Sequence, residues 1–167
     1  EEHSLSNGQV LMRNYSFEEA LVIVREMTDN LALDLFEKGL VTSSLTLWIA
    51  YDHRYEHEAS KGTVKLERES NSSKKIIDAV EDLYLRIADR YTGIRRIEVC
   101  ANRVAPESYV QYSLFDDPKQ TDKERHLQEA VLNVKQRYGK NAIMRGSNLL
   151  ECSTYRERNE QVGGHRA

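Results

Sequence analysis

Paired acidic residues are the first places to look for chemistry in this chain. Phosphoryl transfer of the two-metal kind requires carboxylates that hold metal ions about 4 Å apart. The candidate pairs are Glu56 with Glu58 and Glu67 with Glu69. Neither pair lies in a catalytic motif, and both lie in stretches that are typical of a charged hairpin. We therefore predict solvated charges at these positions and no catalytic residue.

Two histidines four residues apart, His53 and His57, are the second candidate. On a helix this spacing can bind zinc, and Asp52, Glu56 and Glu58 lie close enough in sequence to contribute. The segment is predicted to be a hairpin loop, however, where the spacing loses its geometry. A polar loop is therefore favoured over a metal site, and a small metal-dependent hydrolase is the alternative that depends on these histidines alone.

The elements that position such residues follow from apolar periodicity. Alternating apolar residues predict strands, and apolar residues three and four apart predict helices. The strands are expected over residues 9–13, 41–51, 63–69 and 95–104, and the helices over 16–38 and 72–91. This order, strand–helix–strand–strand–helix–strand, predicts an α+β fold (βαββαβ) with a four-stranded antiparallel sheet and both helices on one face. A C-terminal helix and a polar tail follow.

Local signals set the expected boundaries. Ser16 and Glu19 have the spacing of a capping box that opens the first helix, and Gly39 is suited to its end. Ser72 or Ser73 is expected to cap the second helix, whose apolar face would hold Ile76, Ile77, Val80, Leu83, Leu85 and Ile87.

Pro106 places a domain boundary near residue 105, which divides the chain into 1–105, a linker over 106–119 and a C-terminal region over 120–167. Thr121 and Glu124 form a second capping-box pattern, for a helix that continues to Tyr138. Residues 145–167 are polar and are expected to be partly disordered.

The face of the sheet without helices is expected to be available for a ligand. Arg13, Trp48, Lys65 and Arg96 are predicted to lie on it. Trp48 has two interpretations, a contact with the ligand or packing against the C-terminal tail.

Charge and composition exclude some functions. No apolar run approaches the roughly 20 residues needed to cross a bilayer, and the opening Glu1-Glu2-His3 does not resemble a secretory signal. We therefore expect a cytoplasmic location with Cys100 and Cys152 reduced. The net charge is −3, but seven Lys or Arg against three Glu from Lys135 onward give that stretch +4 and leave −7 elsewhere. A local basic surface of this kind can bind nucleic acid despite an acidic mean.

The segment Gln111–Phe115, with the sequence Gln-Tyr-Ser-Leu-Phe, lies between two prolines and places adjacent Leu114 and Phe115 outside any predicted helix or strand. Exposed large apolar residues in a loop are typical of a linear docking peptide. The alternative is that Leu114 and Phe115 fold back onto the domain as a staple, and the pattern alone does not separate the two.

The chain resembles the C-terminal region of UmuC/DinB-like Y-family translesion DNA polymerases. Gln111–Phe115 is similar to the Gln-x-x-Leu-Phe motif that binds the bacterial sliding clamp, and residues 138–145 and 154–167 are similar to the end of these polymerases. The βαββαβ order matches their little-finger domain. The resemblance covers nearly the whole chain. It implies a domain that grips primer–template DNA through backbone phosphates, with the palm, fingers and thumb, and the Mg²⁺ of catalysis, N-terminal to residue 1.

The resemblance gives the sheet face and the docking peptide specific roles. It implies a DNA-binding and clamp-tethering region that acts in damage bypass and is not itself catalytic. A stand-alone clamp-interacting adaptor without polymerase activity is the alternative. The implied DNA-binding residues are Arg13, Trp48, Lys61, Lys65, Arg96 and Arg103, and the implied clamp-binding residues are Gln111, Leu114 and Phe115.

Overall fold

A computed structural model describes residues 3–108, 117–162 and 165–166 of the chain. None of the helices in these residues is long and apolar enough to span a membrane. In chain order the elements are β1 (His3–Tyr15), α1 (Phe17–Glu37), β2 (Leu40–Tyr51), β3 (Ser60–Ser70), α2 (Ser73–Ile87), β4 (Ile94–Pro106), α3 (Pro118–Tyr138), the 3₁₀ turn η1 (Gly146–Leu149), α4 (Tyr155–Asn159), β5 (Gln161–Val162) and β6 (His165–Arg166).

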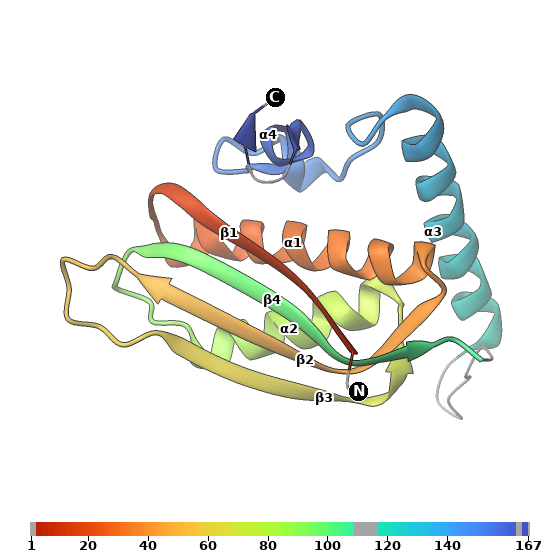
Figure 1. Cartoon of the computed structure of the whole chain (residues 1–167), viewed down its shortest axis with the longest axis horizontal. Coiled ribbons are helices and arrows are strands. Elements are labelled where there is room, and N and C mark those ends of the chain that lie inside the picture. The colour runs from red at the N-terminus through yellow and green to blue at the C-terminus, as the bar shows by residue number, and fades with distance from the viewer. Residues whose placement is uncertain (1–2, 109–116, 163–164, 167) are drawn as a thin grey trace.

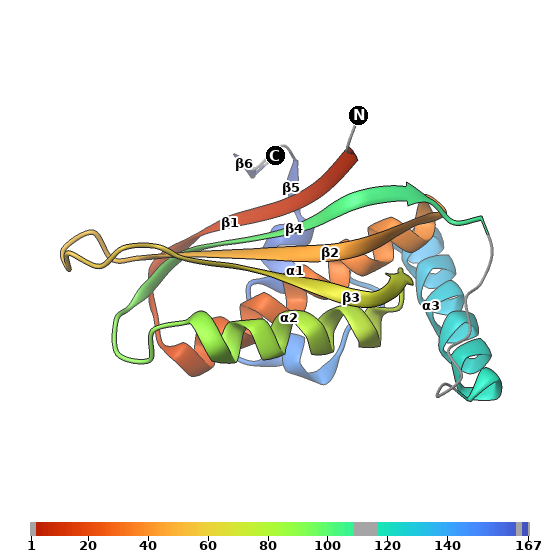
Figure 2. The same ribbon diagram turned by 90° about the horizontal axis from the view of Figure 1, so that it is seen from below.

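The main sheet has the strand order β1-β4-β2-β3, and every neighbouring pair is antiparallel. Figure 2 shows the sheet nearly edge-on, with α1 and α2 together on one side of it. The predicted α+β fold with both helices on one face is therefore confirmed. β5 and β6 form a separate small hairpin.

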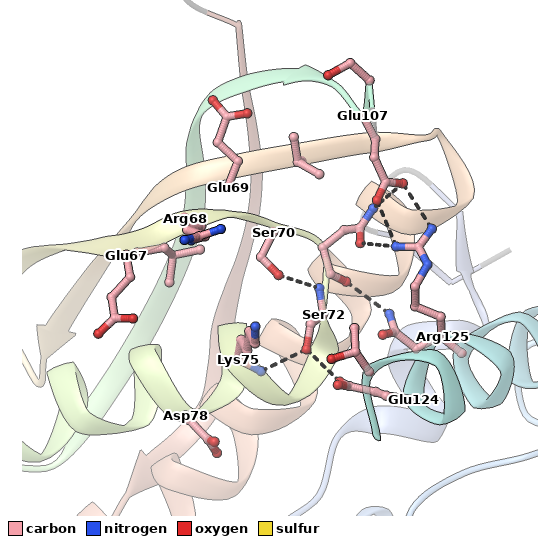
Figure 3. A pocket seen from close by; sticks show the side chains of 16 residues that line it. Glu67, Arg68, Glu69, Ser70, Ser72, Lys75, Asp78, Glu107, Glu124 and Arg125 are labelled. Atoms are coloured by element: carbon pink, nitrogen blue, oxygen red, sulfur yellow. Dashed lines mark hydrogen bonds and ion pairs between the residues drawn. The ribbon is translucent and has the colours of Figure 1, made fainter. Parts of the chain in front are cut away.

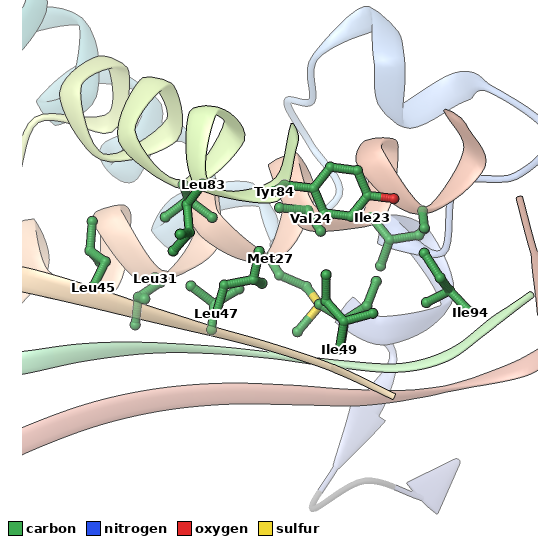
Figure 4. Packing of buried hydrophobic residues seen from close by; sticks show 14 of the residues in the cluster. Ile23, Val24, Met27, Leu31, Leu45, Leu47, Ile49, Leu83, Tyr84 and Ile94 are labelled. Carbon is green, nitrogen blue, oxygen red and sulfur yellow. The ribbon is translucent and has the colours of Figure 1, made fainter. Parts of the chain in front are cut away.

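The core lies between the sheet and the two helices (Figure 4). Alternate residues of β2 point into it, since Leu45, Leu47 and Ile49 are fully buried. They meet Met27 and Leu31 of α1, which lie about one helical turn apart. Burial of such side chains supplies most of the favourable free energy of folding.

Helix α1 begins and ends where the sequence predicts. The Ser16 side chain accepts a hydrogen bond from the Glu19 amide, and the Glu19 carboxylate accepts one from the Ser16 amide. Gly39, just beyond the end of α1, has a positive φ of 62°, a conformation that favours glycine.

Helix α2 differs from its prediction in length and in one face residue. It ends at Ile87, not at residue 91, because Ala88 is extended and the Asp89 side chain accepts bonds from the amides of Tyr91 and Thr92. Leu85, predicted to be apolar core, is 41% exposed, and Tyr84 is buried in its place. The Tyr84 hydroxyl donates to the Phe17 carbonyl at 2.7 Å, which satisfies its polar atom.

Helix α3 starts earlier than the predicted Thr121–Glu124 box. Asp117 is the N-cap and accepts a hydrogen bond from the Lys119 amide, and Pro118 occupies the first turn, where a proline costs no hydrogen bond. The box prediction was wrong, because Thr121 lies inside the helix and Glu124 bonds to a different helix.

The expectation of disorder after residue 145 was wrong for residues 145–162, which the structure describes. This segment packs beside α1 on the side away from α2 (Figure 1). Arg145 makes two hydrogen bonds to the Asp29 carboxylate, at 2.9 and 3.0 Å, and Tyr155 is 2% exposed. Specific polar contacts such as the Arg145–Asp29 pair hold the segment against α1. The composition of the segment does not reveal these contacts. The predicted division of the chain into domains stays a prediction.

Candidate nucleic-acid interface

The face of the sheet that α1 and α2 leave uncovered carries polar side chains from three strands. These side chains alternate with buried ones in β2 and β4 and with half-buried ones in β3, as a pleated sheet requires. A shallow hollow of about 450 Å³ lies on this face. We call its lining the outer patch: Thr46, Trp48, Lys61, Thr63, Arg96, Glu98, Cys100 and Asn102.

Strand register brings these residues together from distant parts of the sequence. Trp48 lies opposite Lys61 on one side and Glu98 on the other. Thr46, two residues earlier, lies opposite Thr63 and Cys100. Directly opposite residues of an antiparallel pair share a face. Strand pairing alone therefore brings the residues of the outer patch together, and no loop residue is needed.

Hydrogen bonds between side chains hold the middle of the outer patch. The hydroxyls of Thr46 and Thr63 are 2.8 Å apart, and the Asn102 amide nitrogen donates to Thr46 at 2.9 Å. Hydroxyl and amide groups are the neutral donors that contact phosphate and sugar in protein–DNA complexes. The surface is thus polar at its centre, which suits a hydrated, charged ligand.

Cations border this polar centre. The Arg96 guanidinium lies over the Trp48 ring, 5.2 Å from its centroid, and 3.5 Å from the Glu98 carboxylate. Lys61 is exposed beside them, and Lys65 follows two residues later on the same face of β3. For the described part of the chain, the structure records no carboxylate partner for either lysine. Both ammonium groups are therefore free to meet an anion.

Cys100, in the same patch, does not have the properties of a nucleophile. Burial, followed by the negative charge of Glu98, raises the pKa of its thiol. A thiol with a raised pKa remains protonated at neutral pH and reacts slowly. Cys100 and Cys152 are both free thiols.

Four of the six residues predicted to bind DNA lie together, and two lie elsewhere. Trp48, Lys61, Lys65 and Arg96 share the uncovered face. The placement of Arg13 on this face was wrong. Its guanidinium lies over the Tyr15 ring and makes an ion pair of 2.6 Å with Glu19 of α1.

The physical reason is strand alternation, since Leu11 and Tyr15, two residues to either side of Arg13, are both buried on the helix-facing side. The ion pair and the Ser16 amide lower the pKa of Glu19 to about 2. Arg103 lies in a register irregularity, between the positions of β4 that pair with His3 and Leu5, and has a positive φ of 50°. It does not line the outer patch.

The acidic and histidine candidates for metal chemistry are dispersed. Asp52 is bound by Arg54 and Asn14, whose hydrogen bonds hold the pKa of its carboxyl well below the usual range. His57 packs against the Tyr51 ring. Figure 3 shows the Glu67 and Glu69 carboxylates pointing away from each other. Within residues 3–108, 117–162 and 165–166, no three His, Cys, Asp or Glu side chains gather as a metal site would require.

A polar junction attaches α3 to the sheet domain (Figure 3). Arg125 of α3 makes an ion pair of 2.8 Å with Glu107, just beyond β4. The Glu124 carboxylate accepts bonds from the Ser72 hydroxyl and the Lys74 amide, at 2.6 and 3.0 Å. It therefore caps the N-terminus of α2, where a negative charge is favourable.

The predicted clamp-binding residues Gln111, Leu114 and Phe115 lie outside the described residues. The described chain on either side of them is held in place. The Glu107 amide donates to the Gly39 carbonyl at 2.8 Å, and Asp117 caps α3. The choice between docking peptide and staple stays a prediction.

Sequence reasoning missed the neutral half of the outer patch. Thr46, Thr63 and Asn102 were not singled out, because each is an ordinary strand residue by itself. Their signal was the alternation that placed Leu45 and Leu47 inside: the residues between must point to the uncovered face.

Comparisons with known proteins identify the family of this chain. The model of the impB/mucB/samB family C-terminal domain matches residues 2–114. The chain is 24% identical over 164 residues to "DNA polymerase IV 2" of Bacillus subtilis (strain 168), which covers 97% of this chain and 39% of that protein. The chain thus spans about two fifths of the length of this curated relative.

Among solved structures, one similar chain is in a "Complex of beta-clamp processivity factor and little finger domain of PolIV", with 11% identity, a TM-score of 0.48, and 68% of this chain and 100% of that chain covered. Another, in the "Post-insertion binary complex of Dbh DNA polymerase", has 16% identity, a TM-score of 0.44, and coverage of 62% and 29%. Because the family model matches well over half of its residues, this chain belongs to the impB/mucB/samB family as its C-terminal domain, and the predicted family is confirmed.

Proposed function

We propose that this chain is the DNA-binding and sliding-clamp-tethering region of a translesion DNA polymerase. The observation that carries the proposal is the outer patch with its Trp48–Arg96 pair, together with Lys61 in the patch and Lys65 beside it, neither of which has an acid partner among the described residues. A face of this kind fits the sugar–phosphate backbone of duplex DNA, which presents regularly spaced negative charge whatever the sequence.

Binding of this kind is weak and independent of base sequence. Phosphate contacts position a protein on DNA but carry no direct sequence information. Each neutralised phosphate releases counterions, so affinity falls steeply as salt rises. Such a grip suits a domain that must follow the duplex past a damaged base.

The test is a titration of labelled primer–template DNA with the 167-residue chain at low and high salt. Replacing Lys65 and Arg96 together by Glu is expected to weaken binding by roughly tenfold or more at low salt, because two phosphate contacts become repulsions. Lys38→Glu with Lys119→Glu is the matched control, since both lysines are exposed and lie outside the outer patch and the basic stretch after residue 135. Equal losses in the two double variants, or an affinity that does not change with salt, would contradict the proposal.

The clamp tether is the second part of the proposal. It is supported by the Gln111–Phe115 sequence, with Leu114 and Phe115 as apolar anchors and Gln111 at the pocket rim. One short peptide buries little area, so we expect an affinity on the order of micromolar. Tethering by a weak link raises the local concentration of a polymerase at the primer end and still permits release.

Replacing Leu114 and Phe115 by Ala separates the docking peptide from the staple. A docking peptide predicts loss of clamp binding in a pull-down with an unchanged melting temperature. A staple predicts a loss of roughly 4–8 kcal/mol in the free energy of unfolding, because two buried side chains are removed. A large drop in melting temperature, together with no clamp binding by the parent chain, would refute the tether.

We place the polymerase chemistry, with its Mg²⁺, in the palm, fingers and thumb that the resemblance implies for the parent protein. This chain is then expected to incorporate no nucleotide with Mg²⁺ or Mn²⁺. Primer extension above background by the purified chain, surviving replacement of Glu67 and Glu69, would overturn this assignment.

A further inference from the structure

A second concave surface lies on the helical side of the molecule, away from the outer patch. It has a volume of about 570 Å³ and is bounded by α1, α2, α3 and residues 143–148. Figure 2 shows α3 standing at one end of the layer formed by α1 and α2. We call this surface the helical groove. Its apolar lining consists of Leu33, Ile77, Leu127, Val131, Ile143 and Met144.

The apolar lining of the helical groove is partly open to water. Leu127 is 63% exposed and Ile143 is 36% exposed. Leu127 and Val131 lie one turn apart on α3, so they form a continuous stripe along one wall. A stripe of large apolar side chains beside a groove is typical of a protein-docking surface.

The floor of the groove also contains an unused polar group. Ser73 is 4% exposed, and its hydroxyl has no hydrogen-bond partner in the described chain. Gln128 and Asn148, which are also buried in this lining, are bonded to Asn71 and Glu26. Buried polar atoms are nearly always paired in native proteins, so the Ser73 hydroxyl marks a polar group that the described part of the chain leaves without a partner.

The charges around the groove have an excess of cations. Lys74 and Arg145 are neutralised by Asp78 and Asp29. The third lining acid, Glu124, is engaged at the start of α2. For Lys123 and Lys135, the structure records no acid partner among the described residues.

These two lysines lie at opposite ends of the apolar stripe. They are separated by three and a third turns of α3, or about 18 Å along the helix. Lys135 donates a hydrogen bond to the Tyr155 hydroxyl and lies over that ring, which holds its charge at the end of the groove.

We propose that the helical groove docks an amphipathic, acidic helical segment of a partner protein. The apolar face of that segment would cover Leu127 and Val131, and an acidic residue near each end would pair with Lys123 and Lys135. Recognition of a helix in a groove uses apolar anchors three and four residues apart, and charge pairing at the rim fixes its orientation. This interaction goes beyond the DNA and clamp functions, because here the chain is the receptor and the outer patch stays free.

The test uses a fluorescein-labelled helical peptide of about 16 residues, with Leu at positions spaced three and four apart and Glu at two positions twelve apart. A second peptide carries Gln at those two positions, and a third is scrambled. Polarisation is measured against the 167-residue chain. We expect the acidic peptide to bind at about 10–100 µM, the Gln peptide roughly fivefold more weakly, and the scrambled peptide not at all.

Variants of the chain locate the binding surface. Leu127→Glu is expected to weaken binding by at least about tenfold, since it places a charge against the apolar face. Lys123→Glu is expected to weaken binding of the acidic peptide about fivefold and of the Gln peptide little. The matched controls are Leu149→Glu, 65% exposed but outside the groove, and Lys119→Glu. A circular dichroism melt checks that each variant is folded.

Several results would overturn the proposal. They are no binding of the acidic peptide up to about 1 mM, equal binding of the acidic and Gln peptides, and equal losses in Leu127→Glu and Leu149→Glu. Self-association that Leu127→Glu abolishes in sedimentation would instead assign the groove to a second copy of the chain. Failure of the DNA proposal gives a different result, since Lys65→Glu with Arg96→Glu leaves peptide binding intact.

Discussion

The two faces of the sheet satisfy their side chains in opposite ways. On the helix-facing side, Leu47 and Val99 are fully buried, and the polar groups of Asn7 and Gln9 are bonded to the tail residues Arg158 and Thr154. On the outer face, Thr46 and Thr63 bond to each other, and Lys61 has no acid partner in the described chain.

The difference shows where stability and binding are separated in this fold. The helical face obtains its partners from α1, α2 and the segment after residue 140, so its contacts stabilise the domain. The outer face contributes little to the core, so its side chains are free to be chosen for a ligand. Leu47 and Trp48 are adjacent in β2 and point to opposite faces. Substitutions at these two positions therefore compare the two faces directly.

The largest expected effect is on the helical face. Leu47→Ala removes a fully buried side chain and is expected to lower the free energy of unfolding by about 2–5 kcal/mol. Urea denaturation measures it. At temperatures where the variant is still folded, its affinity for primer–template DNA should match that of the parent chain. An unchanged denaturation midpoint would show that β2 does not face the core as described.

The second effect concerns the tail. Arg145→Ala removes both hydrogen bonds to Asp29, whose side chain is 13% exposed. Leaving this carboxylate without its partner is expected to cost about 1–3 kcal/mol. Arg137→Ala is the control, because Arg137 is an exposed residue of the same C-terminal region. Faster proteolysis of the tail in the Arg145 variant alone would accompany the loss; equal stability of the two variants would argue against the docked tail.

Sequence patterns were sufficient for the sheet and the first helix. Alternation in β2 and the Ser16–Glu19 box act over two to four residues, so local chemistry determines them. The tail could not be predicted in this way. Arg145 and Asp29 are 116 residues apart, and nothing in the composition of a polar segment indicates which distant carboxylate it meets.

The site was predicted in part for the same reason. Trp48, Lys65 and Arg96 follow from strand alternation and were placed together. Lys61 lies outside the predicted strand and joins them because β3 begins at Ser60. Arg13 was misplaced because it alternates in phase with buried Leu11 and so lies on the side of β1 where Glu19 meets it. Leu11 and Tyr15, two residues to either side of Arg13, are both buried. The alternation with Leu11 was therefore the signal in the sequence that places Arg13 on the helix-facing side.

A smaller effect is expected when the outer face is altered. Trp48→Ala removes the ring beneath Arg96, which should cost about 1 kcal/mol or less in stability. The same change is expected to weaken DNA binding by roughly three- to tenfold, since Arg96 loses the surface that orients it. Comparing urea midpoints and DNA titrations for Trp48→Ala and Leu47→Ala tests the separation directly. A Trp48 variant as unstable as the Leu47 variant would remove the contrast between the two faces.

The smallest effect concerns a buried acid on the helical face. Glu26 of α1 is 2% exposed and accepts hydrogen bonds from Asn148 and Ser153, while its second carboxylate oxygen has no partner in the described chain. Burial is the largest influence on this group and raises the pKa of Glu26, against the opposing effect of those hydrogen bonds. The folded chain therefore holds this proton more tightly than the unfolded chain does.

The direction of the pH dependence follows from that difference. The favourable contribution of protonated Glu26 is fully present below the unfolded pKa of about 4.5 and is lost as pH rises through the higher folded pKa. Glu19 opposes this trend, because its pKa of about 2 in the folded chain gives stability that is lost as pH falls below about 4.5. The Glu19 contribution is small, because its ion pair with Arg13 is exposed to solvent and therefore screened. The pH range in which Glu26 affects stability lies above the unfolded glutamate pKa, and the range for Glu19 lies below it. The two effects can therefore be measured separately.

Urea titrations between pH 4.5 and pH 7.5 should show stability falling with pH in the parent chain and a flatter profile in Glu26→Gln, which has no proton to lose. Parallel profiles for the two proteins above pH 4.5 would mean that Glu26 does not titrate in that window and that its carboxylate is better satisfied than the unpartnered oxygen indicates.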